Sequence, residues 1–120
     1  MKLGFEADRL YLAHMLECID RVSDYVCDDE ALFRSSRLVQ DAVTRNLQVL
    51  AESSQRLSDE IKASEPEVSW RAISGFRNIL VHDYLGVDVD AIWGVVEQDL
   101  PSLRAALGRM LEKSGSRDCP

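Results

Sequence analysis

Apolar residues recur at steps of three and four positions along most of the chain, which is the spacing of amphipathic helices. From Asp8 to about Cys27 these positions form one stripe that a helix would bury. They are Leu12, Met15 or Leu16, Ile19, Val22 and Val26. The acidic run Asp28-Asp29-Glu30 interrupts the pattern. We therefore expect a first helix over about 8–27.

A second and longer pattern predicts a helix from about Ser36 to Lys62, a span with neither Gly nor Pro. Such a helix would be about 40 Å long at 1.5 Å per residue. Its apolar side comprises Val39, Val43, Leu47, Leu50, Leu57 and Ile61. Pro66 has no N–H to donate into a continuing helix, so we expect a loop over 63–67.

Ser69 is a good N-cap for a third helix, which we expect to run to about Asp83 or Tyr84 before Gly86 stops it. Asp88 is suited to capping a short fourth helix, and Pro101 to the first turn of a last one. Alternating strands with hairpin turns are not evident. The sequence thus predicts an all-α bundle of four to five helices, with one domain over 1–113 and a flexible tail over 114–120.

One position in the expected third helix breaks the apolar pattern. The inward series is Trp70, Ile73, Arg77, Leu80 and Tyr84, so a guanidinium stands where an apolar residue is expected. Burial of an unpaired Arg is costly, so Arg77 requires a carboxylate partner, a cleft or a second subunit. Asn78 and His82, four residues apart, lie on a neighbouring strip, and Gly75 leaves room for another backbone or a ligand.

These residue types suit metal-free attack of a ribose 2′-hydroxyl on its own phosphodiester. His82 can carry a proton near neutral pH, Arg77 can hold a phosphate through its fork of donors, and Asn78 can orient either one. The spacing alone also fits a structural role, in which His82 caps the helix end and Arg77 pairs with a carboxylate such as Glu52.

Composition sets bounds on the function. The 120 residues are 46% hydrophobic and 29% charged, with a formal net charge of −7. These values exclude a disordered chain, and no apolar run approaches the ~20 residues of a membrane span. The acidity argues against a general nucleic-acid coat protein. Residues 34–77 carry seven basic and six acidic side chains, whereas residues 1–33 and 78–120 are both acidic overall.

Cysteine usage and the first residues bear on location. Cys18 and Cys27 are nine residues apart, about 13 Å along a helix, which is beyond disulfide reach. The three cysteines show no CxxC spacing, which argues against a disulfide framework or a zinc site. Acidic residues come too early for a secretory signal. The cytoplasm is therefore the expected location.

Several other polar or aromatic residues have structural interpretations. Tyr11, Trp70 and Trp93 lie near apolar stripes and are expected in the core or an interface rather than as base-stacking platforms. His14 is expected at the surface and lacks a spaced metal partner. A polar strip on the second helix is either a solvated face or a contributor of basic charge, or of an Arg77 partner, to a cleft. It comprises Arg45, Glu52 and Arg56.

Four segments carry a resemblance to a known family. They are residues 40–47 (QDAVTRNL), 66–70 (PEVSW), 77–84 (RNILVHDY) and 95–101 (VVEQDLP). The decisive element is Arg77, four residues, His82, one residue and Tyr84. Together these segments closely resemble the HepT-like family of HEPN domains, over nearly the whole chain from about Leu10 to Leu111.

The resemblance implies a toxin of a type VII toxin–antitoxin module, a ribonuclease that needs no metal or other cofactor. It further implies a homodimer whose paired motifs line a cleft between subunits. Arg77 would bind the phosphate, His82 would act as general acid and base, and Asn78 would support them. Tyr84 matches the tyrosine to which an MntA-type nucleotidyltransferase antitoxin transfers AMP from ATP. The alternative is a non-catalytic subunit that binds nucleotide or substrate for such a nucleotidyltransferase.

Overall fold

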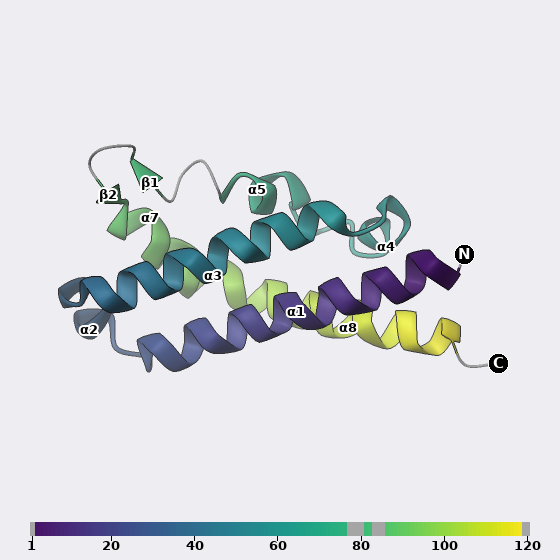
Figure 1. Cartoon of the computed structure of the whole chain (residues 1–120), viewed down its shortest axis with the longest axis horizontal. Coiled ribbons are helices and arrows are strands. Elements are labelled where there is room, and N and C mark those ends of the chain that lie inside the picture. The colour runs from purple at the N-terminus through teal and green to yellow at the C-terminus, as the bar shows by residue number, and fades with distance from the viewer. Residues whose placement is uncertain (1, 77–80, 83–85, 119–120) are drawn as a thin grey trace.

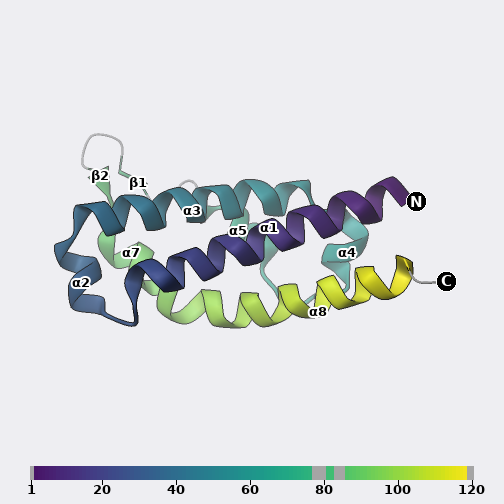
Figure 2. The same cartoon turned by 60° about the horizontal axis from the view of Figure 1, so that its bottom comes forward.

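The computed structural model describes residues 2–76, 81–82 and 86–118, and these form an elongated bundle of 50 × 27 × 22 Å. Figures 1 and 2 show three long helical stretches lying side by side. They are α1 (Lys2–Val26), α3 (Arg37–Arg56) and a last stretch that ends in α8 (Leu100–Asp118). α1 packs against both α3 and α8 and runs antiparallel to them. The predicted all-α fold class is confirmed.

The core follows the predicted apolar stripes. On α1, Leu12, Met15, Ile19, Val22 and Val26 are buried, and Met15 rather than Leu16 occupies the inward position. Tyr11, Trp70 and Trp93 pack partly buried against this core, and the ring of Trp93 lies 5.3 Å from that of Phe33. His14 is exposed, as expected. Cys18 and Cys27 are both free thiols, the first buried and the second exposed.

A short helix that the sequence did not predict connects α1 to α3. The chain turns at Cys27 and Asp28, whose φ angles of 50° and 54° lie in the left-handed region. Asp29 then caps α2 (Glu30–Ser35) by accepting from the N–H of Leu32. The buried side-chain amide of Gln40 donates to the carbonyls of Phe33 and Arg34, which fixes the end of α2 against α3. The acidic run therefore ends one helix and begins another.

The predicted single helix over 36–62 is wrong in its last part. α3 ends at Arg56, Leu57 is extended, and Ser58 caps a separate helix, α4 (Asp59–Ala63). The break is fixed from outside the segment, because both carboxylate oxygens of Asp8 accept from Ser58, one from its N–H and one from its hydroxyl. The helical periodicity of residues 36–62 does not predict this contact.

The last helical stretch is continuous, where two separate helices were expected. Asp88 caps α7 (Val89–Gly94) as predicted, but a π-helical turn, η2 (Val95–Asp99), leads directly into α8. Pro101 lacks an N–H and its ring crowds the carbonyl four residues earlier, so the wider turn accommodates it. α8 also continues past residue 113, where a tail was expected, and Ser114 is buried.

Candidate functional site

The predicted motif lies where the sequence-based assignment of secondary structure fails. α5 (Trp70–Ser74) begins after the predicted cap Ser69, whose hydroxyl accepts from the N–H of Ala72. An unbroken helix to Asp83 or Tyr84 is excluded, because Val81 and His82 form the strand β1. β1 pairs antiparallel with β2 (Gly86–Val87), in the register Val81 to Val87 and His82 to Gly86.

This hairpin changes what the spacing of the motif means. The backbone of His82 is in β1, whereas Arg77, Asn78 and Tyr84 lie outside the described residues. The helical spacing that placed Arg77 and Tyr84 in one inward series is therefore wrong. β-branched Val81 and Val87 favour extended backbone, and Gly86 disfavours helix, so the local preferences agree with the pairing.

The hairpin lies over one end of the bundle, beside α3 and next to α7 (Figure 1). An ion-pair network ties down that end. Arg34 of α2 donates to Glu30 and to Asp90 of α7, both at 2.7 Å. The paired carboxylates raise the pKa of Arg34 above its usual value. The contact with Asp90 holds α7, the helix that follows β2, against α2.

The polar strip predicted on the second helix lies on α3. Arg45, Glu52 and Arg56 are exposed on α3, and the described residues offer none of them an ion-pair partner. A contact with Arg77 stays a prediction.

A Cβ on Gly75 would meet carbonyls of its own helix, Ala72 at 3.3 Å and Arg71 at 3.4 Å. Within the described part of the chain, no other backbone approaches Gly75 closely.

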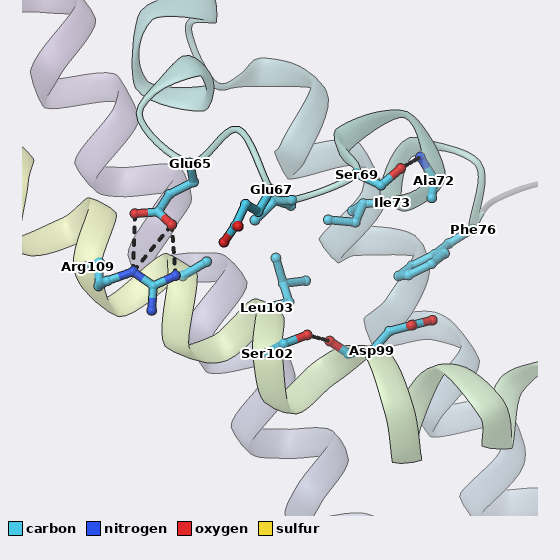
Figure 3. A pocket seen from close by; sticks show the side chains of 12 residues that line it. Glu65, Glu67, Ser69, Ala72, Ile73, Phe76, Asp99, Ser102, Leu103 and Arg109 are labelled. Carbon is cyan, nitrogen blue, oxygen red and sulfur yellow. Dashed lines mark hydrogen bonds and ion pairs between the residues drawn. The ribbon is translucent and has the colours of Figure 1, made fainter.

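A pocket that the sequence did not predict opens between the 65–76 segment and the start of α8 (Figure 3). Its volume is about 340 Å³, at the lower end of the range for small-molecule sites. Apolar and polar side chains both line it. The lining residues are Glu65, Glu67, Val68, Ser69, Ala72, Ile73, Phe76, Asp99, Ser102, Leu103, Ala106 and Arg109.

Glu65 closes one end of this pocket. Its carboxylate accepts from Arg109 at 2.7 Å and from Lys113 at 2.8 Å, while its side chain is only 10% exposed. These hydrogen bonds, first that from Arg109, lower the pKa of Glu65 to about 2. No simple spacing rule links positions 65, 109 and 113, which meet only when the loop packs on α8.

The described residues contain no group of three or more His, Cys, Asp or Glu side chains placed to share a metal ion. In the same part of the chain, no helix combines the length and the apolar character that a bilayer span requires.

Comparison with known proteins identifies the family. The model of the family described as ribonuclease HepT-like matches residues 15–110. This chain belongs to the HepT-like family. The family predicted from the four sequence segments is thereby confirmed. The matched span includes the pocket and the predicted site residues Arg77, Asn78, His82 and Tyr84.

The HepT-like chain also resembles individual proteins. A protein of Thermococcus cleftensis described as "probable ribonuclease HepT" is 31% identical over 99 residues, covering 82% of this chain and 88% of that protein. A "putative RNase" of Caldanaerobacter subterraneus is 31% identical over 109 residues, covering 88% and 95%.

A third relative is longer than this chain. It is a protein of Methanocaldococcus jannaschii described as "gamma-glutamylcyclotransferase and putative RNase", 32% identical over 106 residues. The match covers 88% of the HepT-like chain but 48% of that protein, so the chain spans about half its length. No solved structure gives a significant match.

Proposed function

We propose that this HepT-like chain is a metal-independent endoribonuclease and the toxin of a type VII toxin–antitoxin module. The observation that carries the proposal is the family match over 15–110, which spans an intact Arg77, His82 and Tyr84 pattern. Relatives described as ribonucleases support the reaction class. The substrate is RNA.

In the proposed reaction, the 2′-hydroxyl of a ribose attacks the phosphorus of its own phosphodiester, so that a bond from the 2′-oxygen to phosphorus forms as the bond from phosphorus to the 5′-oxygen breaks. His82 removes the proton from that hydroxyl or donates one to the departing 5′-oxygen. Arg77 binds the phosphate and stabilises the negative charge that develops on it, and Asn78 supports this arrangement. In the proposed homodimer, the two motifs line a cleft between the subunits.

The proposed antitoxin is an MntA-type nucleotidyltransferase that transfers AMP to Tyr84. Tyr84 is two residues from His82 in the sequence. An added AMP group would bring a second phosphate to the motif and occupy space that RNA requires. Modification therefore inhibits cleavage without unfolding the toxin.

The two histidines of the chain provide a matched test of catalysis. Purified wild type, His82→Ala and His14→Ala are each incubated with cellular RNA, with and without a chelator. His14 is exposed on α1 and serves as the control. Loss of a general acid–base residue should reduce cleavage by about 10²- to 10⁴-fold in His82→Ala alone. Chelation should change nothing.

Two results would contradict the proposal in different ways. Absence of cleavage by the wild type, equal to that of His82→Ala, would favour the non-catalytic partner subunit. Loss of activity with the chelator would reject metal independence.

Intact mass after incubation with the nucleotidyltransferase and ATP tests the modification. Wild type and Tyr25→Phe should gain the mass of AMP, and Tyr84→Phe should not.

A further inference from the structure

The pocket beside α8 is lined by the residue that precedes the proposed catalytic motif in the sequence. Phe76 lines one end of the pocket and is followed directly in the sequence by Arg77. Asp99, the last residue of the π-helical turn, and Ser102 line the same end, as Figure 3 shows. The opposite end is closed by the Glu65–Arg109 ion pair. A ligand at the Phe76 end would therefore lie beside the residue that precedes the motif in the sequence.

The polar groups at this end are hydrogen-bond acceptors. The Asp99 carboxylate is exposed and, within the described part of the chain, makes no side-chain hydrogen bond or ion pair. The hydroxyl of Ser102 donates to the Asp99 carbonyl at 3.2 Å, which leaves its lone pairs for a ligand. An ionised carboxylate only accepts hydrogen bonds and repels phosphate. The pocket thus favours a ligand with N–H donors over a phosphate group.

The apolar walls favour a flat ring. Ile73, Phe76 and Leu103 line the pocket and are buried side chains of the core. Proteins that recognise single-stranded RNA place splayed bases against aromatic and apolar side chains, and they hydrogen-bond to the base edges. Carboxylates contact exocyclic amino groups, as in pairing of Asp or Glu with the amino group of cytosine.

We propose that this pocket binds an amino-bearing nucleobase of the RNA substrate, from a nucleotide beside the bond that is cleaved. The inference rests on the proposed ribonuclease function and adds a specificity determinant to it. Asp99 accepts from the amino group of cytosine, adenine or guanine, and the base lies among the apolar residues that line the pocket. Uracil has no amino group and offers only its N3–H, so it is disfavoured.

Binding without cleavage tests this inference directly. His82→Ala protein is titrated with labelled hexauridylate and with the same oligonucleotide carrying one central C, A or G. A good hydrogen-bonded contact to a base is worth about 1 to 3 kcal/mol, so at least one amino-bearing oligonucleotide should bind about tenfold more tightly. Adding Asp99→Ala, which removes the acceptor, should abolish that preference. Adding Asp24→Ala, an exposed change on α1, should preserve it.

Equal binding of all four oligonucleotides, or no binding, would overturn the inference. So would a preference that survives Asp99→Ala. Cleavage assays separate this inference from the proposed function. Wild type that cleaves without base preference retains the function and rejects the pocket. A preference lost in Asp99→Ala, in a protein that does not cleave, retains the pocket and rejects the function.

Discussion

Glu65 shows at the scale of one residue how the fold changes side-chain chemistry. Arg109 and Lys113 lower its pKa from 4.5 to about 2. Because the folded-state pKa lies below the unfolded value, the interaction of Glu65 with these two cations stabilises the fold above about pH 5. This stabilisation is lost as the pH falls toward 2. Both cations are about half exposed, so the screened contribution is about 1 to 2 kcal/mol.

Glu65→Gln should therefore lower the free energy of unfolding by about 1 to 2 kcal/mol at pH 7. The difference from wild type should shrink between pH 5 and pH 2, where the wild-type carboxylate becomes protonated. Chemical denaturation across this range measures it, with Glu112→Gln, an exposed substitution on α8, as control. A difference that is equally large at pH 2 would assign the effect to packing instead of charge.

At the scale of elements, side chains distant in the sequence decide where several helices end. The apolar positions 57 and 61 continue the α3 pattern and are buried as predicted, yet they follow a break in the helix. Asp8, only 2% exposed, fixes that break by accepting from Ser58 at 2.9 and 2.6 Å. Periodicity thus predicted which residues are buried more accurately than it predicted continuous helix.

Asp8→Ala should destabilise the protein by about 1.5 to 3 kcal/mol, because it removes charge-assisted hydrogen bonds that hold the α3–α4 junction. Thermal or denaturant unfolding measures the change. Glu6→Ala, an exposed substitution on the same helix, should remain within about 0.5 kcal/mol of wild type. Equal stability of the two variants would show that the junction does not depend on Asp8.

At the scale of the whole molecule, net charge and assembly bear on the proposed activity. With a formal charge of −7, the chain gains little from non-specific phosphate contacts, so RNA should bind weakly outside the site. In the proposed dimer, the cleft needs two copies of the motif. Leu38 and Leu10, which are 80% and 66% exposed, are surface residues available to such contacts.

Specific ribonuclease activity should consequently fall on dilution, with the same midpoint as the dimer-to-monomer transition measured by sedimentation. The physical reason is that a monomer carries only half of the cleft. The His14→Ala control should follow the wild-type curve. Specific activity that stays constant while the protein becomes monomeric would locate the complete site within one chain.

The sequence by itself determined the fold class, the buried face of each long helix, the caps at Ser69 and Asp88, and the family. Those features depend on periodicity, on local side-chain hydrogen bonds and on motifs, all of which lie within short segments. Only the tertiary structure decided the break at Ser58, the strand at His82 and the pocket beside Glu65. The break and the pocket depend on contacts between residues far apart in the chain, and the hydrogen bonds from Ser58 to Asp8 override the local preference for helix. The strand at His82 depends on backbone pairing with Gly86 across a hairpin, which side-chain periodicity does not specify.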